Sequence, residues 1–482
     1  MNQIRTRIAP SPTGFLHLGT ARTALFNWLF AKKHGGEFIL RIEDTDLERS
    51  DKKYEKDIID GLKWLGLDWS GPSSQGSGEV NEIYHQSERL DIYARYLKQL
   101  LGSGKAFWCD HSKEELEAEQ KEQAAKKEAP RHICDQKDKG LKKGQIIRLS
   151  VDTNSKGEIS FNDEVRGKIE WEEGLLGDFS LAKDLRVPLY NFAATVDDIE
   201  MKISHVIRGE DHISNTPKQI LIYRALGSLA SNLEAKLPSF AHLPLILGSD
   251  RSKLSKRHGA MSIIEYKKDY LPEAMLNFMG FLGYTYSKEI LSKEEMVQEF
   301  ELEKVHKSGA IFDVKKLNWI NSQYIKHLTI DQFKQLTDLS DLPDTAIPLI
   351  TERLEKLTDV QNFDYFWKEP EYNEELLKWK KFSVEDSKKS LEKVKEILSS
   401  HDFKNKDELR NKLDNLAKEM GDPVKSPNDD HGASRGLVYW PLRVALTGRD
   451  KSPDPVDIAY VLGKEKTLER VKNAVNTDVP VI

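Results

Sequence analysis

The chain has 482 residues, of which 38% are hydrophobic and 32% are charged, with two cysteines and a formal net charge of −6. This length predicts two or more domains, and two cysteines exclude a disulfide framework. No apolar run of about 18 residues and no apolar N-terminal signal region occur, so we expect a cytoplasmic protein without a membrane anchor. The net charge does not exclude nucleic-acid binding, because phosphate contacts depend on local Lys and Arg side chains.

The first predicted elements are a strand, a helix and a second strand. Residues 4–9 alternate as a short strand does, and residues 10–14, PSPTG, predict a loop. Thr20 is a plausible N-cap of the helix, and Gly35-Gly36 predicts its end before a strand at 38–42. The apolar residues of the helix recur on one side of a 3.6-residue period: Leu25, Phe26, Leu29 and Phe30. We therefore expect a buried β-α-β unit.

The loop before this helix is a candidate phosphate site. His17, Gly19 and Thr20 lie beside the free N–H groups of a helix N-terminus, which attract anions. The alternative is a simple turn with a structural histidine, which a lone H-x-G motif would favour. The glycine patterns of P-loop and dinucleotide-binding folds are both absent from this segment.

Two pairs of possible metal ligands flank a charged segment, at Cys109 and His111 and at His132 and Cys134. Cysteine and histidine in this number suit a tetrahedral Zn²⁺ site. The alternative is two free thiols and two surface histidines beside a solvated helix, because the C-x-H spacing is a weak signal. Residues 114–128 are predicted to form that exposed helix.

A second candidate phosphate element occupies residues 250–259, DRSKLSKRHG, after an apolar stretch. Lys253, Ser255, Lys256 and Arg257 could fold over a polyphosphate. The alternative is a solvated basic turn, which most short charge clusters are.

The last third of the chain has a helical pattern. Two sets of apolar residues each share one helix face: Leu391, Val394, Ile397 and Leu398, and Leu409, Leu413 and Leu416. This predicts a helical bundle and not a β-barrel. Trp440 and Arg443 are suited to stacking on unpaired bases, although a tryptophan in an apolar context more often belongs to the core.

The two phosphate elements together resemble the HIGH and KMSKS signatures of class I aminoacyl-tRNA synthetases, written here HLGT and KLSKR. The chain as a whole resembles bacterial-type glutamyl-tRNA synthetases. The resemblance rests on RIAPSPTGFLHLGTARTALFNWLF, GGEFILRIEDTD, YNFAATVDDIEMKISHVIRGEDHISNTPKQ, KLSKRHGA and GLVYWPLRVALTGR. The final histidine of HIGH is Thr20 here, and small residues are common at this place in the family.

The resemblance implies an α/β protein with a Rossmann-like parallel-sheet catalytic domain, split by an inserted acceptor-binding domain, and an all-α C-terminal anticodon-binding domain. The implied bounds are residues 1–80 and 190–260 for the catalytic domain, 81–189 for the insert, 261–330 for a stem-contact helical region and 331–482 for the anticodon-binding domain. The implied reaction activates L-glutamate with ATP to glutamyl-adenylate and transfers it to the 3′ end of tRNA(Glu).

The resemblance also assigns site residues. Catalysis is assigned to His17, Thr20, Lys253 and Lys256, with Mg²⁺ on the leaving pyrophosphate. ATP contacts are assigned to His17, Gly19, Thr20, Asp211, Leu245, Ile246, Lys253, Ser255, Lys256 and Arg257. Glutamate contacts are assigned to Arg7, Ser11, Glu43, Tyr190 and Arg208. The family has an asparagine where this chain has Ala194, which leaves one polar contact of the amino-acid site in doubt.

Further expectations concern partners and metal. Some members of the family carry zinc in a two-pair arrangement like that of Cys109, His111, His132 and Cys134, and others have lost it. A site that pairs a buried charge rejects neutral analogues, so no editing domain is expected. The expected partners are tRNA(Glu), L-glutamate and ATP, with no DNA or membrane partner, and family resemblance favours a monomer.

Three alternatives remain open. One is a synthetase that charges tRNA with glutamine, which is expected to read the anticodon of its tRNA with β-barrels. Another is a shortened relative that glutamylates a modified base, which should lack the helical C-terminal third. The last is a catalytically silent binding module, which has no physical reason to retain both phosphate elements.

Overall fold

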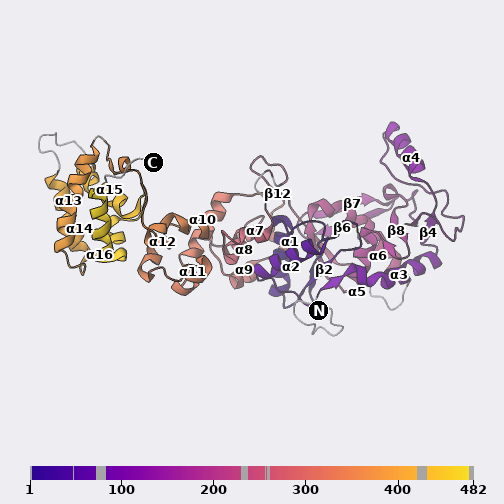
Figure 1. Cartoon of the computed structure of the whole chain (residues 1–482). Coiled ribbons are helices and arrows are strands. Elements are labelled where there is room, and N and C mark those ends of the chain that lie inside the picture. Colours follow the sequence, from indigo (N-terminus) through magenta and orange to yellow (C-terminus); the bar gives the residue numbers. More distant parts are fainter. Residues whose placement is uncertain are drawn as a thin grey trace. The chain divides into compact units, whose positions relative to one another are not determined.

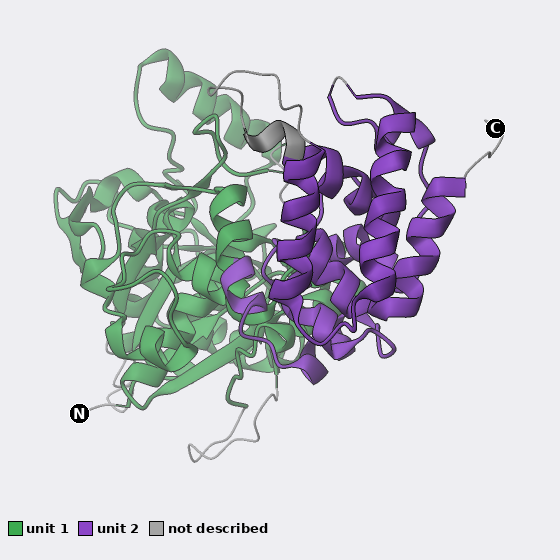
Figure 2. Ribbon diagram, turned by 90° about the vertical axis from the view of Figure 1, so that its left-hand side faces the viewer, with its two compact units in different colours: residues 1–320 green, residues 321–482 purple. Residues whose placement is uncertain are grey.

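The computed structural model describes residues 3–46, 48–71, 83–229, 237–255, 257, 261–380, 382–420 and 431–476 (Figure 1). The chain divides into two compact units, residues 1–320 and residues 321–482, which Figure 2 colours separately. The division falls inside the helix α10 (Val314–Ile325).

The predicted strand, helix and strand open the first unit. They are β1 (Arg5–Ile8), α1 (Leu18–Lys33) and β2 (Glu37–Ile42), and the two strands pair in parallel with Arg5 opposite Glu37. The helix ends just before Gly35, whose φ of +61° is the left-handed conformation that glycine adopts most readily. The prediction of Thr20 as N-cap is wrong. His17 is the N-cap, because its backbone is extended and its side chain accepts the Thr20 N–H.

The first unit also contains a second sheet, which has the strand order β10-β11-β6-β7. Its strands are β6 (Glu158–Asp163), β7 (Gly167–Glu172), β10 (His205–Gly209) and β11 (Ser239–Leu243). β10, β11 and β6 run parallel, and β7 returns antiparallel to β6. The Ser204 N–H donates to the Arg5 carbonyl (3.0 Å), which joins β10 to β1. Parallel strands bind ligands at their carboxyl ends, so the loops after β1, β10 and β11 are placed to share one site.

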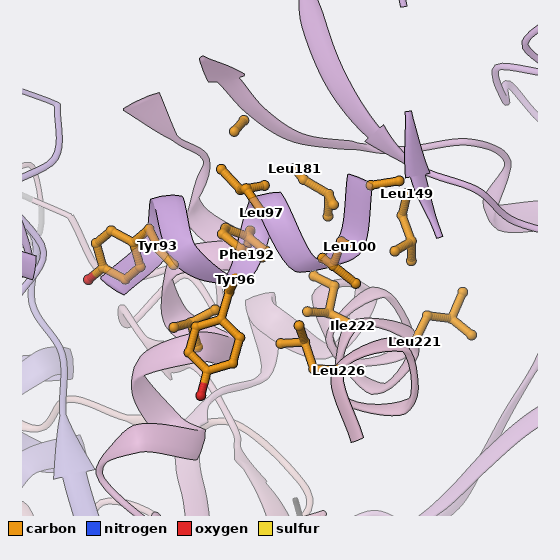
Figure 3. Close-up of a cluster of buried hydrophobic side chains, with 14 of the residues drawn as sticks. Tyr93, Tyr96, Leu97, Leu100, Leu149, Leu181, Phe192, Leu221, Ile222 and Leu226 are labelled. Atoms are coloured by element: carbon orange, nitrogen blue, oxygen red, sulfur yellow. The ribbon is translucent and has the colours of Figure 1, made fainter. Parts of the chain in front are cut away.

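An antiparallel sheet with the order β4-β5-β8-β9 lies between β3 and α5 in the sequence. Besides β6 and β7, the elements between β3 and α5 are η1 (Gln86–Arg89), α3 (Leu90–Gly102), β4 (Ala106–Cys109), α4 (Lys113–Ala125), β5 (Ile146–Leu149), η2 (Glu173–Leu176), β8 (Ser180–Asp184) and β9 (Val187–Pro188). The apolar face of α3 packs with α5 (Tyr190–Glu200), α6 (Thr216–Gly227) and this sheet around one core, in which Leu97 and Phe192 are fully buried (Figure 3). The core therefore holds the insert on the helices that precede and follow β10.

The remaining elements of the first unit complete its helical face and its loops. They are α2 (Lys52–Trp64), β3 (Tyr84–His85), η3 (Glu210–Asn215), β12 (Ile246–Leu247), α7 (Ile263–Tyr266), α8 (Pro272–Gly280), α9 (Lys293–Glu299), η5 (Leu302–Lys304) and β13 (Ala310–Ile311). The guanidinium of Arg22 on α1 donates to the carbonyls of Pro244 and Leu282 (2.5 and 3.1 Å), which braces α1 against the chain after β11 and the end of α8.

The second unit is helical, as predicted, and its described residues contain no strand. Its elements are α11 (Ile330–Thr337), η6 (Asp344–Ala346), α12 (Ile347–Thr351), η7 (Leu357–Phe366), η8 (Glu374–Leu377), α13 (Val384–Ser400), α14 (Lys406–Glu419), α15 (His431–Thr447) and α16 (Pro455–Asn476). Leu391, Val394 and Leu398 are buried together on α13, and Ile397 beside them is half-buried. Across the described ranges of both units, every helix is too short or too polar to cross a membrane.

Candidate active site

The HLGT loop wraps its histidine over the start of α1. His17 Nδ1 accepts the Thr20 N–H at 3.3 Å, and the Thr20 hydroxyl lies 3.1 Å from His17 Nε2. A Cβ at Gly19 would lie 3.3 Å from the His17 ring, so the ring is seated closely against this glycine. The structure therefore places His17, Gly19 and Thr20 together at a helix N-terminus, where N–H groups and the helix dipole favour anions.

The KLSKR loop approaches the same place. Lys253 Nζ lies 3.5 Å from Asp211 Oδ2, and both groups act electrostatically on His17. Burial and then the Lys253 cation lower the pKa of His17, while Asp211 partly opposes them, so the imidazole is neutral near pH 7. Lys256 lies outside the described residues, whereas Ser255 and Arg257 are exposed in the loop. His17, Asp211 and Lys253, which are far apart in sequence, thus meet with Gly19 and Thr20 in what we call the two-loop site.

A carboxylate that the sequence did not single out ties the two loops together. Asp57 on α2 accepts the Leu16 N–H (2.7 Å), just before His17, and the Ser262 hydroxyl (2.9 Å), just after the second loop. The Ile263 N–H also donates to the Leu16 carbonyl at 2.8 Å. Asp57 is only 9% exposed, so the clamp is shielded from water. Nothing in its sequence context, KDIID, distinguishes it from a surface helix carboxylate.

The backbone near Leu245 and Ile246, which the resemblance assigns to ATP contacts, is hydrogen-bonded to neighbouring segments. The Leu245 N–H donates to Glu210 Oε1 (2.8 Å), and the Leu254 N–H donates to the Ile246 carbonyl (2.9 Å). These bonds fix the start of the KLSKR loop relative to η3, which carries Asp211.

Beside the two-loop site, arginines and acids from three elements form a cluster. Arg7 on β1 is 4% exposed and donates to both oxygens of Asp198 on α5, at 3.1 and 3.3 Å. Arg41 on β2 is fully buried and donates to Asp198 at 2.8 Å and to Glu43 at 3.4 Å. We call this group, with Tyr190 and Arg208, the arginine cluster. A fixed cluster of this kind is suited to holding a ligand that carries both carboxylate and ammonium groups.

Glu43 is a carboxyl group of the cluster with a strongly altered acidity. Burial raises its pKa, which Arg41 and Arg7 partly offset, and the result is a pKa of about 7. Its backbone N–H donates to the Pro10 carbonyl (3.0 Å), next to Ser11, which is exposed in the turn after β1. Glu43 is therefore placed to become a full anion when a cation arrives beside it.

Tyr190 and Arg208 complete the cluster from α5 and β10. Arg208, Glu43, Arg7 and Asp198 all act electrostatically on the Tyr190 phenol, so the predicted residues are brought together. The Tyr190 hydroxyl also lies 3.1 Å from His212 Nδ1. Burial, followed by the Arg208 cation, lowers the pKa of His212 to about 4, so this ring is neutral near pH 7. Ala194 is buried on α5 and offers no side-chain hydrogen bond at its place.

Sequence reasoning missed Arg41, Asp197 and Asp198. Asp197 is fully buried and accepts from Gln86, Arg89 and Tyr93, which lie on η1 and α3. A usable signal existed, because two consecutive acids stand in the apolar segment FAATVDDI, where buried charges require partners.

The four possible metal ligands lie together in the insert. One ligand atom from each of Cys109, His111, His132 and Cys134 falls within 4.8 Å of every other. Cys109 Sγ is 3.3 Å from His111 Nδ1 and 3.7 Å from His132 Nε2, and Cys134 Sγ is 3.7 Å from His111 Nδ1. Carboxylates hold the other ring nitrogens, with Glu119 at 2.5 Å from His132 Nδ1 and Asp135 at 3.2 Å from His111 Nε2. This donor set and its outer carboxylates fit a tetrahedral Zn²⁺ ion.

A hollow of about 400 Å³ lies next to these ligands, with basic side chains along it. Its lining includes Arg131, Arg148 and Lys218, together with Asn191, the residue after Tyr190 of the arginine cluster. The carboxylates of Glu119 and Asp178 also line it. Basic side chains of this kind attract phosphate groups.

In the second unit, Trp440 belongs to the packing of α15. Its Nε1 donates to the Leu376 carbonyl (2.8 Å), and its ring lies 4.9 Å from that of Trp379. Arg443 donates to the Ser452 hydroxyl at 3.1 Å. These contacts agree with the expectation that a tryptophan in an apolar context belongs to the core.

Comparisons with known proteins match the whole chain. The family model for "tRNA synthetases class I (E and Q), catalytic domain" matches residues 3–319, and the "Anticodon binding domain" model matches residues 295–475. A glutamate–tRNA ligase of Carboxydothermus hydrogenoformans is 40% identical over 98% of this chain and 100% of the relative. Glutamate–tRNA ligase 1 of Syntrophomonas wolfei is 41% identical over 99% of this chain and 97% of the relative.

Solved structures agree in fold. The glutamate tRNA ligase from Elizabethkingia meningosepticum, in complex with its amino acid, aligns with a TM-score of 0.81 and 32% identity over 99% of this chain and 100% of that one. The parallel-sheet catalytic unit and the helical second unit are thus those of this family. The chain belongs to the glutamate–tRNA ligase family of class I tRNA synthetases.

Proposed function

We propose that the two-loop site and the arginine cluster together activate L-glutamate with ATP and then pass it to the 3′-terminal adenosine of tRNA(Glu). The observation that carries this proposal is that Arg208, on β10, and Asp211, just after β10, are three residues apart and lie one in each site. His212 experiences the charges of Arg7, Arg208 and Asp211 together, so the two sites adjoin. An amino acid held by the arginines would therefore lie next to a triphosphate held by the loops.

The first step is an in-line displacement. An oxygen of the glutamate α-carboxylate attacks the α-phosphorus of ATP, a new C–O–P linkage forms, and the bond to pyrophosphate breaks. Both reactants are anions, so the site acts by positioning them and by neutralising charge. We assign His17, Gly19, Thr20 and Lys253 to the phosphates, with Lys256 and Arg257 closing over them. ATP would enter as its Mg²⁺ complex, in which the ion neutralises charge on the departing pyrophosphate.

In this proposal the arginine cluster selects the amino acid. Arg7 and Arg208 receive its carboxylates and Glu43 faces its ammonium group, with Tyr190 and Ser11 along the side. Asp211 and the chain at Leu245 and Ile246 hold the nucleoside of ATP. Arginine suits this task because its planar fork binds a carboxylate through two hydrogen bonds. Glutamine, which lacks the second charge, would leave a buried guanidinium without its counter-ion.

In the second step a ribose hydroxyl of the tRNA attacks the activated carbonyl and releases AMP. We propose that the insert, residues 81–189, guides the acceptor end. The hollow lined by Arg131, Arg148 and Lys218 supports this, because it extends to Asn191 beside the arginine cluster. Residues 261–330 would contact the stem and residues 331–482 the anticodon. We infer a monomer in the cytoplasm, where its nucleotide and tRNA substrates are found.

We also propose that Cys109, His111, His132 and Cys134 hold a structural Zn²⁺ ion, which would stiffen the loops on either side of α4. Metal analysis of untagged protein should find about one zinc per chain, and Cys134→Ser should remove it and lower the melting temperature of the insert. A metal-free wild-type protein that melts like the variant would contradict the proposal. The ion is assigned no part in the reaction.

The reaction is tested by charging purified tRNA with labelled glutamate or glutamine. Glutamate alone should be accepted, and charging with glutamine alone would overturn the assignment. Lys253→Ala and Lys256→Ala should each cripple ATP–pyrophosphate exchange measured with tRNA present. Lys268→Ala is the matched control, because Lys268 is an exposed lysine outside both sites. Unchanged exchange in the first two variants would defeat the assignment of the loop.

A further inference from the structure

Arg208 ends a buried chain of hydrogen bonds that no substrate contact explains. It lies on β10 directly opposite His242 on β11 in the parallel register. His242 in turn contacts Asp163, the last residue of β6, and both of these side chains have an exposed fraction of 0%. The chain Asp163, His242, Arg208 therefore runs from the edge of the β6–β7 hairpin to the arginine cluster.

The Asp163 carboxylate is surrounded by donors. It accepts the backbone N–H groups of Val165 (3.0 Å), Arg166 (2.8 Å) and His242 (3.1 Å), and it lies 2.6 Å from His242 Nδ1. Burial raises the pKa of Asp163, but the His242 ring and the backbone donors outweigh it and lower the pKa overall. The carboxylate is thus ionised and accepts only, so His242 Nδ1 must carry a hydrogen.

This assignment fixes the other side of the histidine ring. Burial lowers the pKa of His242, so the ring is neutral and its Nε2 carries a lone pair. Nε2 lies 3.2 Å from Arg208 Nε and 3.1 Å from the Thr216 hydroxyl. It can therefore accept the Arg208 Nε–H, which the opposite tautomer would repel.

Arg208 is then held at two of its three nitrogens. Nε donates to His242, and Nη2 donates to the Thr216 hydroxyl at 2.8 Å and to the His212 carbonyl at 3.4 Å. The third, Nη1, is buried and has no hydrogen bond in the described part of the chain. A buried guanidinium nitrogen without an acceptor is costly, and a substrate carboxylate would satisfy it.

We propose that His242 is a positioning residue for glutamate recognition: held by Asp163, it presents Nε2 to Arg208 and so keeps Nη1 free for the substrate carboxylate. The inference rests on the proposed role of Arg208 in binding glutamate. His242 contacts no substrate itself and acts through Arg208. A merely structural Asp163–His242 pair would affect stability alone, whereas positioning must appear in the KM for glutamate.

The test measures tRNA glutamylation by the full chain, with KM for glutamate and for ATP determined separately. His242→Asn keeps a donor near Asp163 but removes the acceptor for Arg208. It should raise the KM for glutamate by about tenfold to a hundredfold, the range of a lost hydrogen bond to a charged group, with less than about threefold change in kcat and in the KM for ATP. An unchanged KM for glutamate, or equal losses in all three quantities, would overturn the inference.

Two further histidine variants provide a rescue test at His242 and a matched control elsewhere in the chain. His242→Gln can place an amide oxygen near the position of Nε2 and should rescue the KM for glutamate to within about threefold of wild type. Failure of this rescue in a folded protein would count against the role of Nε2. His401→Asn is the matched control, because His401 is also buried and bonded, to the Tyr460 hydroxyl at 2.9 Å, but lies in the second unit. It should lower the melting temperature and leave the KM for glutamate unchanged.

Two more variants separate the possible failures. If His242→Asn does not fold, Thr216→Val removes the nearer acceptor of Nη2, and also a hydroxyl 3.1 Å from His242 Nε2, at nearly constant volume. It should raise the KM for glutamate severalfold, and no rise would overturn the inference. Arg208→Lys tests the proposed role of Arg208 in binding glutamate, on which the inference about His242 rests. If Arg208→Lys leaves the KM for glutamate unchanged, the binding role of Arg208 fails. If it raises that KM while His242→Asn and Thr216→Val do not, only the positioning role fails.

Discussion

The pKa of Glu43 gives a quantitative prediction for glutamate binding. Glu43 is 8% exposed, and burial raises its pKa to about 7 against the opposing effect of Arg41 and Arg7. Asp197 and Asp198 also act on Glu43 and contribute to this raised pKa. Only the ionised carboxylate can hold the substrate ammonium with a full charge, so binding should release a proton from this group below pH 7.

The sign and size of the effect follow. For a carboxyl group with a raised pKa, affinity for a cation is gained as the pH rises through that pKa. The ionised fraction of Glu43 should increase from about one-tenth at pH 6 to about nine-tenths at pH 8, so the KM for glutamate should fall by about tenfold over this range. His212, with its pKa lowered to about 4, remains neutral throughout.

The assay is the initial rate of tRNA glutamylation at saturating ATP and constant ionic strength, from pH 6 to pH 8. Glu43→Gln should give a high KM for glutamate that no longer varies with pH, which separates Glu43 from His17 and from the tRNA. The KM for ATP serves as the internal reference. A wild-type KM for glutamate that is flat across this range, or a pH dependence that survives in Glu43→Gln, would refute the reasoning.

Three other substitutions test separate parts of the chain. Asp57→Asn, which weakens the clamp on Leu16 and Ser262, should raise the KM for ATP by about threefold to tenfold in the same assay, and an unchanged value would contradict the clamp. Leu97→Ala in the insert core should cost about 2–5 kcal/mol in urea denaturation, and a loss below this range would mean that the site collapses around the smaller side chain. Gly436→Ala should cost about 1–3 kcal/mol, because overpacking is destabilising and its Cβ would lie 2.0 Å from Trp379 Nε1. Gly102→Ala, where a Cβ meets nothing within 4 Å, is the control and should not destabilise the chain.

Local patterns predicted the local structure well. The alternation at 4–9, the 3.6-residue period around Leu25 and the glycine pair at 35–36 depend on neighbours in sequence, and the structure has a strand, a helix and a helix end there. The apolar faces of α13 and α14 were equally evident. The N-cap was missed because histidine seldom caps helices. The general preference for residues such as threonine at this position therefore favoured Thr20 over His17.

The rest depends on contacts between distant segments. The place of β6 beside β11 joins residues 163 and 240, and no short-range signal in the sequence predicts it. Asp57, Asp198 and His242 matter through partners that are 26 to 205 positions away. The resemblance supplied Arg7 and Arg208 as substrate contacts, but it did not supply the buried groups that orient them.

The unsatisfied Nη1 of Arg208 has a consequence for thermal robustness. Because this buried donor has no acceptor, the enzyme without glutamate should be less stable than a variant in which another side chain accepts a hydrogen bond from Nη1. Glutamate should raise the melting temperature by satisfying this donor. Selection for heat resistance alone would therefore favour substitutions that give Nη1 an acceptor within the protein. Such variants would gain thermal stability and bind glutamate more weakly.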